Sequence, residues 1–140
     1  MRLHVVARGR IGQGAEADLV ARYAKRMTWP FTVTELPDSG GRSPELPAPT
    51  RIAALDEGGD MLTSTELARR LERWRDDGVR ETRFLIGAAD GLTVAERASA
   101  DLVLSFGRAT WPHLLVRAML AEQLYRATTI LAGHPYHREG

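Results

Sequence analysis

The chain has 140 residues, a length that fits one domain with a buried core. Hydrophobic residues make up 44% and charged residues 26%, as in ordinary globular proteins, and the net charge of +1 gives no overall signal for nucleic acid. The sequence has no apolar run long enough for a membrane span, no signal-peptide pattern and no cysteine, which excludes disulfides and thiolate metal sites. We therefore expect a single cytoplasmic domain over residues 1–140.

The hydrophobic pattern predicts strands that alternate with helices. Strands are expected over residues 2–7, 31–36, 51–55, 82–86 and 102–106. Helices are expected over residues 15–27, from 63 to about 77, from 93 over a short stretch, and from 112 to about 131. The segment 37–50, rich in proline, glycine and serine, is the one plausible flexible loop. This alternation predicts a mostly parallel sheet that is covered on both faces.

Two of the helix starts carry capping boxes, in which a threonine and a glutamate three residues later satisfy exposed amides. The pairs are Thr63 with Glu66 and Thr93 with Glu96. Each pair precedes a predicted helix, so both helices are expected to begin there.

The C-terminal tail holds chemistry that is unusual for a chain end, since tails are normally polar and dispensable. Gly133 suits the left-handed residue that closes a helix, and Pro135 prevents the helix from resuming. The tail is therefore expected to turn back onto the protein. It carries Tyr136, His137 and Arg138, which can exchange protons or contact phosphate. On residue types alone, a solvated tail is an equally good interpretation.

Three predicted strands end in glycine-containing segments. Leu55 runs into DEGG, Ile86 into GAADG, and Phe106 into GRATWP. Ligands of parallel sheets bind at the carboxyl ends of the strands, and glycine lets backbone approach a ligand closely, so these ends predict a pocket. The dinucleotide, Walker, HExxH and GxSxG motifs are absent, and the histidines lack carboxylates at metal-ligand spacing, so we expect no metal.

An ordered series of motifs resembles a known family. The motifs are LIG at 85–87, DGL at 90–92, LSF at 104–106, TWPH at 110–113, EQLYRA at 122–127 and HPYHRE at 134–139. In this order they closely resemble the RlmH family of SPOUT-class methyltransferases. The resemblance is dense over residues 55–139 and weaker in the first strand and helix, so it covers nearly the whole chain.

The resemblance implies the fold and the reaction. The fold would be α/β: a SPOUT-type α/β/α sandwich with a mostly parallel sheet and a C-terminal deep trefoil knot, a rare exception to unknotted topology. The reaction would be S-adenosylmethionine-dependent methylation of N3 of a pseudouridine in helix 69 of 23S rRNA, on the assembled 70S ribosome. The family works as a homodimer through its last helix. Neither a membrane nor a metal is implied.

The resemblance also assigns site residues. The cofactor pocket would comprise Leu55, Gly87, Phe106, Gly107, Arg108, Ala109, Thr110 and Trp111, which belong to the same three strand ends. His137 or Tyr136 would assist removal of the imide proton, and Arg138 or Arg117 would hold RNA phosphate or the developing oxyanion. As alternatives, His137 packs the tail and Arg117 pairs with a carboxylate.

The last helix carries the expected dimer contacts. The residues of this candidate face are Leu114, Leu115, Ala118, Met119, Glu122 and Tyr125. As an alternative, they pack only in the core of their own chain. Glu122 and Arg126 stand four residues apart, which favours an ion pair on the helix surface.

Other functions stay open. A SPOUT methyltransferase of transfer RNA would normally bring an added RNA-binding domain or basic arm, which this chain lacks. A non-catalytic dimer would bind S-adenosylmethionine and associate with RNA or ribosomes, and a generic nucleotide-binding module would bind ATP or NAD without transfer. The chain departs from relatives at Ala88, which would be strained at a positive φ, and in the short loop 37–50.

Overall fold

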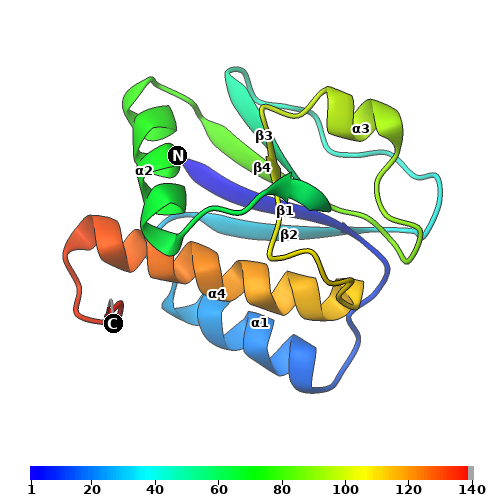
Figure 1. Ribbon diagram of the computed structural model, residues 1–140, viewed down its shortest axis with the longest axis horizontal. Coiled ribbons are helices and arrows are strands. Elements are labelled where there is room, and N and C mark those ends of the chain that lie inside the picture. The colour runs from blue at the N-terminus through cyan, green and yellow to red at the C-terminus, as the bar shows by residue number, and fades with distance from the viewer. Residues whose placement is uncertain (139–140) are drawn as a thin grey trace.

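The computed structural model describes residues 1–138. In this part of the chain, five strands form one sheet in the order β2-β1-β4-β3-β5, and all pairings are parallel (Figure 1). The strands are β1 (Arg2–Arg8), β2 (Phe31–Leu36), β3 (Thr50–Asp60), β4 (Glu81–Ile86) and β5 (Leu102–Leu104). The helices are α1 (Ala15–Arg26), α2 (Ser64–Asp76), α3 (Val94–Ala98) and α4 (His113–Ala132). The predicted alternation of strands and helices is confirmed.

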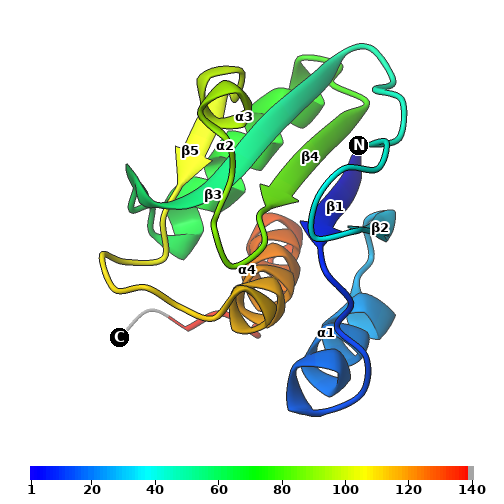
Figure 2. The ribbon, with the colours of Figure 1, turned by 90° about the vertical axis from the view of Figure 1, so that its right-hand side faces the viewer.

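The two faces of the sheet are covered by different kinds of structure (Figures 1 and 2). On one face, α4 lies against both α1 and α2. Alternate strand residues, such as Val5 of β1 and Phe84 of β4, form the core there with Leu71 of α2 and Leu124 of α4. On the other face lie α3 and the loop 37–49, over the intervening residues of β1, β3 and β4. A parallel sheet needs both faces shielded from solvent. Here helices cover one face, and the loop 37–49 helps α3 to cover the other.

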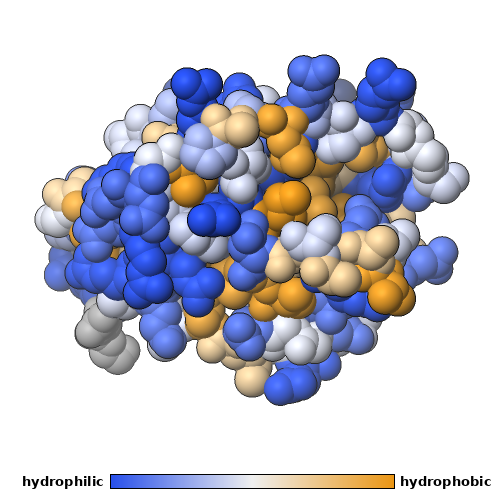
Figure 3. Space-filling view, turned by 90° about the horizontal axis from the view of Figure 1, so that it is seen from above, coloured by the Kyte–Doolittle hydropathy of each residue, from blue (hydrophilic) through white to orange (hydrophobic). Residues whose placement is uncertain are grey.

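Helix α2 illustrates how local sequence sets an element. The Thr63 hydroxyl accepts from the Glu66 amide at 3.1 Å, and the Glu66 carboxylate accepts from the Thr63 amide at 2.9 Å. The buried side of the helix carries Leu67, Ala68, Leu71 and Trp74. Its outer side is hydrophilic, as the blue region at the left of Figure 3 shows. The capping box at Thr93 is also present, at the start of α3, so both predicted boxes are confirmed.

Strand β3 is longer, and β5 shorter, than the sequence predicts. The prediction that β3 stops at Leu55 was wrong: after a register shift, β3 pairs with β5 again where Asp60 faces Leu104. A Cβ on Gly59 would lie 2.5 Å from the carbonyl oxygen of Val103, so only glycine permits this approach. Past Leu104 the chain is held by loop contacts, beginning with the Ser105 amide, which donates to the Asp60 carbonyl at 2.9 Å.

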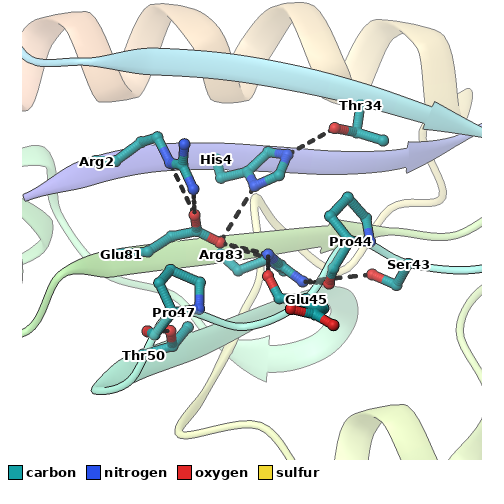
Figure 4. Close-up of polar contacts among 10 residues, drawn as sticks. All are labelled: Arg2, His4, Thr34, Ser43, Pro44, Glu45, Pro47, Thr50, Glu81 and Arg83. Atoms are coloured by element: carbon teal, nitrogen blue, oxygen red, sulfur yellow. Dashed lines mark hydrogen bonds and ion pairs between the residues drawn. The ribbon is translucent and has the colours of Figure 1, made fainter.

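A buried polar network lies on the sheet face beneath the loop 37–49 (Figure 4). Its centre is the Glu81 carboxylate, which is 0% exposed. This carboxylate accepts from Arg2 at 2.6 and 2.8 Å and from Arg83 at 2.7 Å, and it lies 3.2 Å from Nδ1 of His4. Three cationic or donor side chains on β1 and β4 therefore converge on one carboxylate.

The same network fastens the loop to the sheet. The Arg83 guanidinium, which is 2% exposed, donates to the carbonyls of Pro44 at 2.6 Å and Glu45 at 2.9 Å. Figure 4 shows the loop crossing β4 at this point. The segment that composition marked as the one plausible flexible loop is thus tied at its middle to a buried arginine.

The pKa values in the network follow from burial and neighbouring charge. Burial would raise the pKa of Glu81, but the hydrogen bonds from Arg2 and Arg83 outweigh it and leave that pKa below its usual value. Burial lowers the pKa of His4, and the Glu81 charge offsets this only in part. A neutral His4 can donate from Nδ1 to Glu81 while Nε2, 2.7 Å from the Thr34 hydroxyl, accepts from it.

Helix α4 has 20 residues and ends as predicted, at Gly133 with a left-handed φ of 71°. Its buried residues, which include Leu120 and Leu124, lie on the side that faces α1, α2 and the sheet. Within residues 1–138 no helix is both long and apolar enough to cross a membrane. The deep trefoil knot stays a prediction.

Candidate active site

A cavity of about 360 Å³ opens at the carboxyl ends of β3, β4 and β5, which are neighbours in the sheet. The prediction that these three strand ends share one edge is confirmed. Seven of the eight residues predicted to hold a cofactor line the cavity: Leu55, Gly87, Phe106, Gly107, Ala109, Thr110 and Trp111. The eighth, Arg108, is exposed and lies outside the lining. Their role in cofactor binding stays a prediction.

The wall that follows β4 depends on a glycine. A Cβ on Gly87 would lie 2.4 Å from the carbonyl carbon of Gly91 and 2.7 Å from the amide nitrogen of Leu92. The turn is closed by the Gly91 amide, which donates to the Ala88 carbonyl at 2.8 Å. Within residues 1–138 only glycines have a positive φ, so the strain considered for Ala88 is absent.

The wall that follows β5 is fastened to β3. Ser105 is 3% exposed, and its hydroxyl accepts from the Gly107 amide at 3.0 Å. The same hydroxyl lies 3.0 Å from the Glu57 carbonyl and 2.9 Å from the Gly107 carbonyl, either of which can accept its proton. Further along the loop, the Thr110 hydroxyl donates to the Glu57 carboxylate at 2.9 Å. The exposed ring of Trp111 lies next in the lining.

Four charged side chains line the cavity for which the sequence predicted no individual role. Asp56, Glu57 and Asp90 belong to the segments DEGG and GAADG, which were expected at the pocket without roles for single side chains. Arg97 of α3 was missed altogether, because its place over the cavity depends on how α3 packs. Arg97 donates to the Leu92 carbonyl at 2.8 Å and lies 3.8 Å from Asp56. Three carboxylates against one guanidinium make the lining favourable to a cation.

The tail folds back onto α4, as predicted. The Tyr136 hydroxyl donates to Glu122 at 3.2 Å, and the Tyr136 ring lies 4.8 Å from that of Tyr125. The predicted pair of Glu122 with Arg126 is confirmed, with contacts of 2.5 and 2.9 Å. Arg126 also lies over the Tyr136 ring, and it donates to Nδ1 of His137 at 3.1 Å.

This packing separates the two candidate bases. Burial, a hydrogen bond with Tyr23 and the Glu122 charge raise the pKa of Tyr136 to about 12. The phenol therefore stays protonated at neutral pH and acts as a donor in this position. His137 is the better candidate base of the two, because an imidazole nitrogen can accept a proton whereas the protonated phenol can only donate its own. Arg138 is exposed at the end of the described chain.

Within one chain, the tail and the cavity are not brought together. The cavity lies at the first residues of α4, where His113 and Val116 line it, and the tail packs around Glu122 and Arg126 beyond its middle and past its end. Glu122 follows Val116 by six residues, which is about 9 Å of helix at about 1.5 Å per residue. Tyr136, His137 and Arg138 do not line the cavity of their own chain.

Arg117 occupies a third position, at 2% exposure beside the loop that follows β1. It pairs with Glu35 at 2.5 Å and donates to the Gly9 carbonyl at 3.0 Å. The hydrogen bond from the Ile11 amide lowers the pKa of Glu35 most. Partial burial opposes this shift, and the hydrogen bond and charge of Arg117 add to it. A guanidinium buried in this way does not fit the predicted contact with RNA phosphate or an oxyanion. The structure instead favours the alternative, in which Arg117 pairs with a carboxylate.

A second hollow, of about 600 Å³, runs along the outer side of α4. Four members of the predicted dimer face line it: Leu115, Ala118, Met119 and Glu122. Leu19 and Tyr23 of α1 form another side, and Met61 at its edge is 57% exposed. The predicted face is thus partly open to the surface and not consumed by the core of its own chain.

The fold and the cavity define a class of protein: a parallel α/β domain that binds a ligand where glycine-rich loops follow neighbouring strands. Residues 1–137 match the family described as Predicted SPOUT methyltransferase. Ribosomal RNA large subunit methyltransferase H of Rhizorhabdus wittichii is 67% identical over 140 residues, which is 100% of both chains. The chain therefore belongs to the SPOUT methyltransferases, in the RlmH family that its motifs predict.

Two solved structures are similar in fold. A probable methylase family protein from Haemophilus influenzae Rd KW20 has a TM-score of 0.59, with 11% identity, over 99% of this chain and 70% of that chain. The SpoU methyltransferase AviRb from Streptomyces viridochromogenes, in complex with AdoMet, has a TM-score of 0.53, with 13% identity, over 91% of this chain and 57% of that chain. At these identities the likeness concerns the fold alone.

Proposed function

We propose that this single domain is a cytoplasmic S-adenosylmethionine-dependent methyltransferase that methylates N3 of a pseudouridine in helix 69 of 23S rRNA, on the assembled 70S ribosome. The observation that carries the proposal is the cavity lined by seven of the eight residues assigned from the family. The name of the relative from Rhizorhabdus wittichii supports a ribosomal RNA substrate, and the AdoMet bound to AviRb supports the cofactor. The nucleotide and the 70S particle rest on the resemblance of the motifs.

The residues of the cavity fit S-adenosylmethionine. A volume of about 360 Å³ falls within the usual range for small-molecule sites. Loop amides and carbonyls after β4 and β5 suit the edge of an adenine, and Gly87 lets the turn after β4 pack closely on the backbone of Gly91. The carboxylates of Asp56 and Asp90 suit a cation. When bound, the cofactor supplies an electrophilic methyl group on a positively charged sulfonium.

The chain's own residues would position and prepare the nucleophile. The attacking nitrogen is an imide N–H, so the reaction needs a base or a nearby cation as the proton leaves. In the proposal, His137 accepts this proton, Tyr136 holds the tail through its donor hydroxyl, and Arg138 binds RNA phosphate. Arg117 acts indirectly, since it holds the loop after β1 against α4.

A homodimer would complete this site. In one chain the tail packs on Glu122 and Arg126, and none of residues 136–138 lines the cavity. If a second copy covers the hollow along α4 in the opposite direction, its tail approaches the cavity of the first chain. The open face with Leu115 and Met119 supports this arrangement, because an apolar face on the surface is a usual site of protein contact.

The test is transfer of labelled methyl from S-adenosylmethionine to ribosomal particles that lack the modification. We expect label on N3 of the pseudouridine in helix 69 with 70S particles, and much less with free large subunits or naked 23S rRNA. Label on another nucleotide would overturn the assignment of the substrate. Cofactor binding in a calorimeter without transfer to any particle would instead indicate a non-catalytic binder.

The role of His137 is tested with the same assay. Removing a general base usually costs about 10²- to 10⁴-fold, so His137→Ala should lower the transfer rate by at least about 100-fold. Cofactor affinity should stay within a few-fold. The matched control is His134→Asn. The Tyr136 amide donates to His134 Nδ1, and asparagine keeps an acceptor for this amide. Full activity of His137→Ala would remove His137 from the catalytic residues.

A further inference from the structure

The loop after β5 contributes five of the residues that line the cavity, and three of these, at positions 109–111, are exposed. Residues 106, 107 and 109–111 all line the cavity, and Trp111 is 44% exposed. Gly107 has a φ of 123°, a backbone conformation that glycine adopts far more readily than other residues. The position of this loop therefore depends on a few polar contacts.

Those contacts converge on one residue of the neighbouring strand. At the start of the loop, the buried Ser105 hydroxyl lies 3.0 Å from the backbone carbonyl of Glu57. Near its end, the Thr110 hydroxyl donates to the side-chain carboxylate of the same Glu57 at 2.9 Å. Glu57 thus meets both ends of the loop, once through its backbone and once through its side chain.

Strand β3 places Glu57 where it can do this. The strand continues past Leu55 and follows β5 because Gly59 permits backbone contact with Val103. The next residue of β3, Asp60, accepts from the Ser105 amide at 2.9 Å. The extension of β3 that the sequence did not predict is therefore the support on which the cavity loop rests.

We propose that Glu57 is a positioning residue, which sets the loop 105–111 in its ligand-binding conformation through its contacts with Ser105 and Thr110. The effect on cofactor binding rests on the proposed function, whereas the effect on the loop does not. Glu57 acts through Thr110, so the carboxylate and the hydroxyl should behave as one coupled unit. An independent contact of either side chain with the ligand would give separate effects.

Hydrogen exchange of the backbone amides of residues 106–111, without cofactor, tests the loop itself. Glu57→Ala and Thr110→Val should each raise the exchange rate of these amides at least about fivefold. The reason is that local opening of the loop no longer has to break the charge-assisted hydrogen bond between Thr110 and Glu57. Glu57→Gln and Thr110→Ser keep an acceptor and a hydroxyl, so they should stay within about twofold of the original chain. Unchanged exchange in Glu57→Ala would overturn the proposal whatever the cofactor does.

Calorimetric titration with S-adenosylmethionine tests the consequence. Glu57→Ala and Thr110→Val should each weaken binding about 5- to 10-fold, and the double variant should be no weaker than either single variant. Losses that multiply in the double variant would overturn the coupling. Glu72→Gln, on the exposed side of α2, is the control for a remote carboxylate. If the original chain fails to bind the cofactor, the proposed function falls, and the exchange experiment still decides the role of Glu57.

Discussion

The two polar regions of this sheet are built in opposite ways. On the face beneath the loop 37–49, Glu81 receives hydrogen bonds from Arg2 and Arg83, lies beside His4, and is 0% exposed (Figure 4). At the carboxyl ends of β3, β4 and β5, the closest ion pair, between Asp56 and Arg97, is 3.8 Å long and partly exposed. Charge is satisfied within the chain in the first region and left available in the second.

The difference separates structural from functional chemistry. Buried charges are tolerated when their hydrogen bonds are complete, as around Glu81, and such a network fixes neighbouring elements in place. A ligand site needs groups that can still form bonds, together with backbone that can be approached, and the cavity has both. A perturbed pKa does not separate the two kinds of chemistry, since it occurs at Glu81 and His4 in the buried network and also at Tyr136 in the tail.

The largest expected effect comes from breaking the satisfied region. Glu81→Ala leaves Arg83 buried without its carboxylate, and breaking a buried pair costs about 3–5 kcal/mol of unfolding free energy. Urea unfolding measures this loss. Glu72→Ala on α2 is the control, since its ion pair with Arg69 is exposed and worth at most about 0.5 kcal/mol. Similar losses in both variants would show that the network is not the stronger region.

The next effect concerns the open region. In Gly87→Ala the added Cβ meets the backbone of Gly91 at 2.4 Å, so the turn after β4 must shift. We expect a loss of up to about 3 kcal/mol in unfolding free energy and at least about tenfold weaker cofactor binding. Gly12→Ala, outside the cavity and with no atom within 4 Å of the added Cβ, should lose less stability and leave cofactor binding unchanged. Unaltered binding in Gly87→Ala would mean that the turn is not part of the site.

A smaller effect on stability tests whether Arg117 has a structural or a catalytic role. Because Arg117 is buried with Glu35 and the Gly9 carbonyl, Arg117→Ala should lower unfolding free energy by about 2 kcal/mol. Transfer by the folded fraction should fall less than in His137→Ala. Arg73→Ala, on the exposed side of α2, is the control for loss of a surface arginine. A catalytic loss as large as that of His137→Ala, at full stability, would return Arg117 to the catalytic residues.

The smallest effect is a pH dependence of the satisfied region. The folded pKa of His4 lies below its ordinary value of 6.5, so the unfolded chain binds a proton first, and stability should decline as pH falls below about 6.5. The folded pKa of Glu81 lies below 4.5, so its contribution is complete above about 4.5 and is lost at lower pH. Urea midpoints between pH 8 and pH 4 measure the first part. If the His4→Gln variant still loses stability between pH 8 and pH 4 as the original chain does, another group causes that loss.

Local rules were enough for the elements and for most of the pocket. Capping boxes at Thr63 and Thr93 placed two helix starts, and Gly133 placed one helix end, because each acts over a single turn of chain. Glycine-containing segments after buried strands indicated the three strand ends, and the resemblance to the RlmH family then assigned residues 87 and 106–111 there. Arg97 had no such signal, since nothing adjacent in sequence brings α3 over the cavity.

The amino-acid sequence by itself determined the order of strands and helices, the helix caps, the family and the three strand ends that form the cavity. These depend on periodicity and on motifs, which are properties of neighbouring residues. Only the tertiary structure decided that β3 runs on to Asp60, that Arg83 ties down the loop 37–49, and that Arg117 is buried with Glu35. It also decided that the tail packs on Glu122 and Arg126 of α4, outside the lining of the cavity. Such contacts join residues far apart along the chain, and their partners are chosen by packing of the whole sheet.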